Sequence, residues 1–172
     1  PAKTGANSLV IDKTTTLGIA LSAFFRLKLG WPDAKFPILE AVLGAEAAPD
    51  GLLDSNWYLG LVTLHGTIMV FFVLTGGLSG TFSNILIPLQ VGARDMASGL
   101  LNMIAYWLFF LSSLLMAASL FIETGPAMAG WTIYPPLSVL EELQPGSGLG
   151  MTLWLLSMTV FIASSLIGGI NY

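Results

Sequence analysis

The sequence predicts an all-α integral membrane protein, a polytopic bundle of transmembrane helices forming a single membrane domain over residues 1–172. Composition is the first reason: charged residues make up 9% of the chain, apolar residues 55%, and the mean hydropathy is +0.81. A typical soluble domain has about 25% charged residues, so most of this surface must face lipid or other protein. The second reason is three long charge-free stretches, each able to cross a hydrocarbon core of about 30 Å as a helix.

The first element is a foreshortened helix over residues 14–29. Its charge-free run, Thr14 to Phe25, is too short to cross a core of about 30 Å unaided. Either Lys13 and Arg26 extend it by snorkelling, or residues are absent from this version of the chain. The three clear spans follow, and their backbone must be helical because lipid offers it no other hydrogen-bond partners. These spans are predicted at about 57–89, 98–122 and 149–172.

Two long connections and one tight turn join these spans. The long ones, at residues 30–56 and 123–148, are rich in proline and acidic residues, and we expect a short surface helix within 37–48. The tight turn at 90–97 contains Arg94 and Asp95. Lys and Arg are nearly balanced between the two sides, so the positive-inside rule does not fix the orientation.

Several kinds of chemistry are excluded or disfavoured. The chain has no cysteine, which rules out disulfides, thiolate metal sites and iron–sulfur ligation within it. The net charge of −4 makes nucleic acid a poor partner. The chain begins at Pro1 without the basic segment of a secretory signal peptide and stops directly after an apolar run. We therefore expect a fragment of a longer protein.

One histidine, His65, lies in the charge-free run from Ser55 to Ala93. A polar ring in a membrane-spanning segment is costly unless it is satisfied, so it is a candidate functional residue. An imidazole nitrogen is the commonest protein ligand of haem iron. The alternative is a histidine that hydrogen-bonds between helices, and the residue alone favours neither. A haem normally takes a second axial ligand, and because this chain has no other histidine, the partner of His65 on an iron would be missing from this sequence.

Asn84, Asp95 and Asn102 flank the same turn between two predicted spans. Amide side chains can hold ordered water. A carboxylate at the mouth of a bundle, with amides deeper on two adjoining helices, could admit protons along a chain of waters. The alternative, which the residues alone favour slightly, is that Asp95 and its neighbour Arg94 only mark the membrane edge.

Other residues have simpler interpretations when taken alone. Trp131 and Tyr134, beside a double proline, are typical of an interfacial aromatic belt. Gly76 and Gly80 have the spacing that lets a neighbouring helix or a cofactor approach closely, and helix packing is the favoured interpretation.

Six strings in this chain resemble, in shared order and spacing, subunit I of the haem–copper oxidases of the cytochrome c oxidase type. Each string alone is weak evidence, whereas the set is highly specific. The strings lie at residues 26–32, 63–66, 84–89, 92–97, 131–137 and 164–171.

The resemblance implies a low-spin haem site. His65 matches an axial ligand of the low-spin haem (haem a or haem b) on the second transmembrane helix. Arg26 matches the arginine near the formyl group of that haem. Trp131 and Tyr134 fall in the segment that lies near the haem propionates.

The resemblance also implies a proton path. Asp95 matches the entrance of the D proton channel, and Asn84 and Asn102 fall where the family has channel asparagines. The family orientation puts His65 towards the outer side and Asp95 on the inner side.

Departures from the family pattern are visible, and one of them is that the predicted first helix is shorter than the family's. Lys28 stands where mitochondrial members have a glutamate of a cation site, which puts that site in doubt. Met103 follows Asn102 where many members have a second asparagine. The high-spin haem, the copper centre and their ligands are expected from the missing remainder of a twelve-helix fold. This fragment is therefore not expected to be active alone.

The function implied is the N-terminal part of the catalytic subunit of a proton-pumping terminal oxidase, passing electrons from cytochrome c to O2 with water formed. The implied partners are oxidase subunits II and III, cytochrome c, O2 and the lipid bilayer, and the implied location is the bacterial cytoplasmic (inner) membrane. The alternative is a non-catalytic membrane scaffold or an electron carrier like a b-type cytochrome.

Overall fold

The computed structural model describes residues 2–143 and 148–172, and within them the chain is helical with no strand. The α-helices are α1 (Ala2–Gly30), α2 (Pro37–Leu43), α3 (Ser55–Thr67), α4 (Asn84–Val91), α5 (Gly99–Ala118) and α6 (Gly148–Asn171). Three helical stretches are long and apolar enough to cross a membrane: Ser55–Val91, Gly99–Phe121 and Gly148–Asn171. The predicted class, an all-α integral membrane bundle, is confirmed.

Helix α1 begins well before the predicted first span. It starts at Ala2 and continues through Asp12 and Lys13 without a break, so only its charge-free part is short. The threonines that follow do not interrupt it, because Thr15 and Thr16 donate their hydroxyl hydrogens to the carbonyls of residues one turn earlier. Helix α1 is not among the three stretches that meet the membrane-span criteria.

The stretch from Ser55 to Val91 is one continuous helix, in which two segments are π-helical and therefore wider than an α-helix. It begins at Asp54, whose carboxylate caps the free N–H groups of Asn56 and Trp57 at 2.8 and 3.4 Å. Its middle contains two π-helical segments, η2 (Ile68–Thr75) and η3 (Leu78–Ser83). It ends at Gly92, whose φ of 72° is the left-handed conformation that glycine adopts without strain.

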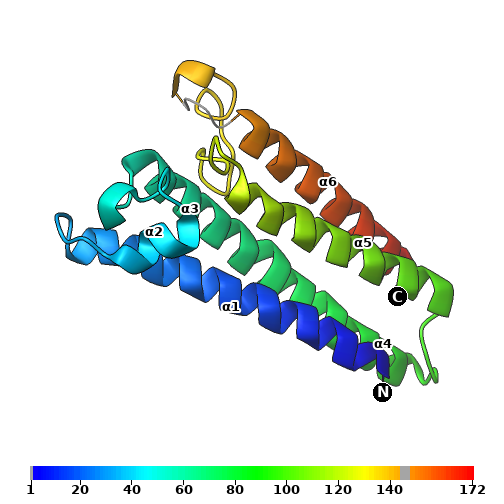
Figure 1. The fold of residues 1–172 in the computed structure, drawn as a ribbon. Helices are drawn as coiled ribbons and strands as arrows, with labels where there is room; N and C mark the ends of the chain where they lie inside the picture. The colour runs from blue at the N-terminus through cyan, green and yellow to red at the C-terminus, as the bar shows by residue number, and fades with distance from the viewer. Residues whose placement is uncertain (1, 144–147) are drawn as a thin grey trace.

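The long helices pack as two antiparallel pairs (Figure 1). Helix α1 lies along α3 and η2 and buries Leu21 and Phe25, while α5 lies along the whole of α6. An aromatic cluster of Phe72, Phe109 and Phe161 joins the pairs, with ring centroids 5.2 to 6.1 Å apart. The buried core surrounds α3 and continues to Ile68 and Phe72 of η2.

The connections lie at opposite ends of the bundle (Figure 1). At one end are α2, the 3₁₀ turn η1 (Pro49–Gly51) and the connection after η4 (Ser119–Phe121), which contains η5 (Glu141–Leu143). Helix α2 confirms the predicted short helix within residues 37–48. At the other end the turn at 92–98 meets the end of α6, because Ala97 N–H donates to the carbonyl of Asn171 at 3.4 Å.

Candidate functional site

His65 lies half-buried on the last two turns of α3, facing α1. Its Nδ1 is 2.8 Å from the backbone carbonyl oxygen of Gly18 on α1. A carbonyl can only accept, so Nδ1 must bear the hydrogen, and the neutral imidazole then has its lone pair on Nε2. A ring oriented by an Nδ1–H donor bond to a carbonyl is the usual arrangement of a metal-ligating histidine.

Gly18 lets α1 approach this closely. A Cβ at this position would lie 2.8 Å from the sulfur of Met69 and 3.3 Å from Cγ2 of Ile68. A larger residue would require the Met69 side chain to move or α1 to shift away from η2, and a shift of α1 would lengthen the bond to His65. This role could not be predicted from the sequence, because 46 residues separate Gly18 from His65 in the chain.

Phe25 connects His65 with Arg26. The Phe25 ring makes an edge contact with the imidazole, with centroids 5.5 Å apart, and the Arg26 guanidinium lies 5.1 Å from the centroid of the same ring. Arg26 is exposed and donates to the carbonyl of Ser22 at 3.3 Å. The structure thus places Arg26 near His65 through the Phe25 ring that both residues contact.

Trp131 reaches the same region from the long loop, whereas Tyr134 does not. The indole packs against Gly66, where a Cβ would lie 2.8 Å from its Cδ1, and makes an edge contact with Phe71. Trp131 therefore adjoins the residue directly after His65. Tyr134 is 72% exposed and points away from the core of the bundle.

A chain of buried hydrogen bonds fixes α3 against α6 and the loop. The indole Nε1–H of Trp154 on α6 donates to Thr67 Oγ at 3.0 Å, and Thr67 donates to the carbonyl of Thr63 at 2.8 Å. Thr63 Oγ accepts the backbone N–H of Gly130 at 2.9 Å. Thr63 and Thr67 lie two residues on either side of the histidine, so this network sets the position of α3 on which His65 sits.

A second site is a cavity of about 140 Å³ between η3, α5 and α6. It brings together Asn84 and Asn102, two of the three residues proposed for the proton path. Asn84 donates from Nδ2 to the carbonyl of Gly80 at 2.6 Å, and its buried Oδ1 has no hydrogen-bond partner among the described residues. A buried acceptor without a partner is normally satisfied by water.

The same cavity has polar lining residues that the sequence did not single out. Their hydroxyl groups lie at intervals too irregular to form a visible motif. They are Thr75, Ser79, Tyr106, Ser164, Ser165 and Tyr172. The Tyr172 hydroxyl donates to the carbonyl of Ser79 at 3.1 Å and so joins α6 to η3 across the cavity.

Asp95 lies outside this cavity, in the exposed turn below it. Its carboxylate accepts the backbone N–H of Met96 at 2.9 Å. The fully buried Asn171 holds that turn, because its Oδ1 accepts the N–H of Ser98 at 2.7 Å. The described structure therefore fixes the turn firmly while leaving the Asp95 carboxylate in solvent.

Gly76, one of the two glycines with helix-packing spacing, adjoins an aromatic ring. A Cβ on Gly76 would lie 2.9 Å from Cε2 of Phe109 on α5. This contact agrees with the packing interpretation.

These features define a polytopic helical membrane protein with one histidine oriented by a backbone carbonyl and a polar cavity at the opposite end. The described residues contain no group of three or more His, Cys, Asp or Glu side chains that could hold a metal ion.

The family model described as cytochrome c and quinol oxidase polypeptide I matches residues 14–172. The chain belongs to this family, the subunit I family of the haem–copper oxidases, and is an integral membrane protein.

Three relatives show how much of the family protein is covered. The alternative cytochrome c oxidase subunit 1 of Bradyrhizobium diazoefficiens is 39% identical over 165 residues, which is 96% of this chain and 25% of that protein. The cytochrome c oxidase subunits 1 of Synechocystis and Thermostichus vulcanus are 42% and 40% identical over 74% and 73% of this chain. This chain spans 22% and 21% of their lengths, so it corresponds to about a quarter of a relative or less.

Proposed function

We propose that this chain forms the N-terminal part of the catalytic subunit of a proton-pumping terminal oxidase in a bacterial cytoplasmic membrane. In the complete enzyme, cytochrome c donates electrons and O2 is reduced to water. The single observation that supports this best is the His65–Gly18 hydrogen bond of 2.8 Å inside a chain of this family. Family membership favours the oxidase over a scaffold.

The residues around His65 suit a low-spin haem. His65 would hold the iron through Nε2, Arg26 would face a polar substituent of the macrocycle, and Trp131 would flank its edge. When bound, the haem supplies one-electron transfer. The protein's own contribution is to orient the imidazole through Gly18, to make it a better donor by hydrogen bonding Nδ1–H, and to keep water from the apolar side of the ring through Phe25.

Tyr134 needs a different account. With 72% of its surface exposed in the described residues, it would contact the haem only after the loop or the remainder of the subunit covers it. We assign it a peripheral role at the propionate side. The high-spin haem, the copper and their ligands would come from the rest of the subunit, and other subunits would complete the complex.

The cavity at the inner end suits proton uptake. Asp95 would collect protons at the surface, and the amides of Asn84 and Asn102 would hold the water that continues the path. The unpaired Oδ1 of Asn84 supports this proposal, because it offers a hydrogen-bond acceptor to a cavity of about 140 Å³, which is large enough for several waters.

His65→Ala in the full-length enzyme tests the haem assignment. We expect loss of the optical band of the low-spin haem, measured in the purified complex, because the iron loses a strong-field ligand. His65→Met keeps a ligand and should shift the band and raise the midpoint potential. Leu59→Ala, an exposed position on the same helix, is the control. An unchanged low-spin band in both His65 variants would refute the assignment.

A further inference from the structure

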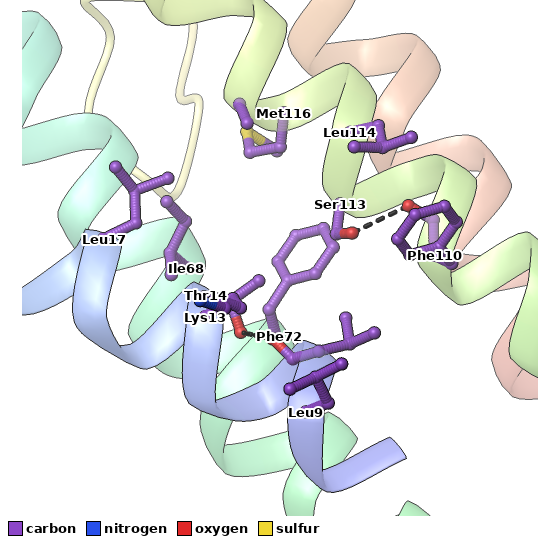
Figure 2. A pocket seen from close by; sticks show the side chains of 12 residues that line it. Leu9, Lys13, Thr14, Leu17, Ile68, Phe72, Phe110, Ser113, Leu114 and Met116 are labelled. Atoms are coloured by element: carbon purple, nitrogen blue, oxygen red, sulfur yellow. Dashed lines mark hydrogen bonds between the residues drawn. The ribbon is translucent and has the colours of Figure 1, made fainter. Parts of the chain in front are cut away.

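Thr63 lies on the opposite side of α3 from His65. Residues two positions apart on an α-helix project about 200° from each other, so His65 reaches α1 while Thr63 faces the long loop. Further along the same helical stretch, η2 contributes Ile68 and Phe72 to an apolar pocket of about 270 Å³ between α1 and α5 (Figure 2). Thr63, rather than this apolar surface, makes the polar link between the helix and the loop.

The hydroxyl of Thr63 has one possible hydrogen-bond arrangement. It lies 2.8 Å from the carbonyl oxygen of Leu59 and 2.9 Å from the backbone nitrogen of Gly130. A carbonyl only accepts and an N–H only donates, so the hydroxyl hydrogen points to Leu59 and a lone pair points to Gly130. The side chain is 1% exposed, so little water competes for either bond. Thr63 thus holds the loop at one defined atom.

That atom lies where the loop turns towards the histidine. Gly130 has a φ of 77°, the left-handed conformation that favours glycine. Its carbonyl accepts the N–H of Ile133 at 3.2 Å and closes a turn. The indole of the next residue, Trp131, packs on Gly66. The turn therefore starts at the amide that Thr63 holds, and it presents Trp131 to the residue directly after His65.

We propose that Thr63 is a positioning residue for the low-spin haem site, because its hydroxyl sets the position of Trp131 relative to His65. This inference rests on the proposed function, in which His65 holds the iron and Trp131 flanks the edge of the macrocycle. Two turns of α3 then carry the iron ligand on one side and the group that holds the loop on the other.

Loss of the Thr63 hydroxyl has two consequences. The Gly130 N–H is left without its acceptor, and the loop shifts to let that N–H reach water. Water then reaches the edge of the macrocycle beside Trp131. A more polar surrounding favours the oxidised haem, which carries one more positive charge than the reduced haem, and so lowers the midpoint potential.

Hydrogen–deuterium exchange of the full-length complex, measured by mass spectrometry over residues 126–137, tests the contact itself. The Gly130 amide should exchange slowly in the wild-type protein, and fast exchange there would overturn the proposal without any variant. Thr63→Val keeps the shape of the side chain but removes the hydroxyl, and should accelerate exchange at residues 130–133 about tenfold or more. Thr63→Ser restores the hydroxyl and should restore slow exchange.

Thr67→Val is the matched control for exchange. It removes an equally buried hydroxyl one turn along α3, which accepts the indole N–H of Trp154 instead of a loop amide. Exchange at residues 130–133 should stay slow in this variant. Equal acceleration in Thr63→Val and Thr67→Val would show a general loosening of the bundle and would overturn the proposal.

A spectroelectrochemical titration of the low-spin haem band tests the positioning role. The midpoint potential should be lower in Thr63→Val than in the wild-type complex, and Thr63→Ser should return it to the wild-type value. Accelerated exchange in Thr63→Val with an unchanged potential would overturn the role. A wild-type complex without a low-spin band would instead refute the haem assignment on which the role rests, and the exchange data would still decide whether Thr63 holds the loop.

Discussion

Pro126 is held between two helices by two glycines, and this contact allows a quantitative prediction. On α3, a Cβ at Gly60 would lie 2.6 Å from Pro126 Cγ. On α6, a Cβ at Gly150 would contact the carbonyl oxygen of Gly125 and lie 2.8 Å from the carbonyl carbon of Pro126 and 3.0 Å from the nitrogen of Ala127. All three atoms facing Gly150 belong to the backbone, so no side-chain rotation can relieve the overlap.

Gly150→Ala should therefore separate α6 from the loop by about 1 Å, since α3 blocks Pro126 on its other side. Overpacking of this kind costs about 1–3 kcal/mol, and a backbone contact belongs at the upper end. Replacing a helical glycine by alanine returns about 1 kcal/mol. The net loss is about 2 kcal/mol, which corresponds to a fall of about 1–2 °C in the thermal midpoint of a subunit about four times as long as this chain.

The matched control is Gly169→Ala in the same helix, where a Cβ would meet nothing within 4 Å. Alanine raises the helix propensity at position 169 as it does at position 150, but no overlap opposes it there. The thermal midpoint of Gly169→Ala should therefore stay equal or rise. Both variants are measured in the full-length complex by thermal denaturation, together with the low-spin haem band, since the displaced loop contains Trp131. Equal midpoints for the two variants would show that this packing argument is wrong.

Three further predictions concern the two proposed sites. Gly18→Ala should weaken the His65 hydrogen bond and change the electron paramagnetic resonance of the low-spin haem, whereas Gly77→Ala, with open space around it, should leave that signal intact. Trp154→Phe removes the donor to Thr67 and should lower stability by about 0.5–1.5 kcal/mol in thermal denaturation, because the Thr67 hydroxyl then keeps only its bond to the Thr63 carbonyl; an unchanged midpoint would contradict a structural role. Asp95→Asn in the full-length enzyme should slow turnover or uncouple proton pumping in vesicles, and normal pumping at normal turnover would remove the channel assignment.

The sequence predicts the three clear spans closely and the first helix poorly, for one physical reason. Hydropathy measures the free energy of placing side chains in lipid. The bounds predicted from it agree within a few residues with the helical stretches Ser55–Val91, Gly99–Phe121 and Gly148–Asn171. Helix formation instead depends on the backbone, which tolerates Asp12 and Lys13. Helix α1 therefore extends far beyond the charge-free segment that hydropathy detects.

The candidate site could be predicted in its parts but not in its assembly. His65 can be found from the sequence because it is a lone histidine in an apolar run. Asn84 and Asn102 can be found because their amide side chains flank one turn. The carbonyl of Gly18, the indole of Trp154 and the serines of the cavity leave no local pattern, because their roles depend on how α1 and α6 pack.

The charges within α1 affect how the chain enters the membrane. When a helix with Asp12 and Lys13 near its middle moves by itself from the translocation channel into lipid, its free energy falls little. The reason is that each charge adds an unfavourable free energy of transfer. It is also synthesised before α3, the helix that buries its Leu21 and Phe25. Stable insertion of α1 should then wait for α3 and proceed as a helical hairpin. The first helix of this subunit is thus retained in the bilayer by its protein neighbours more than by lipid.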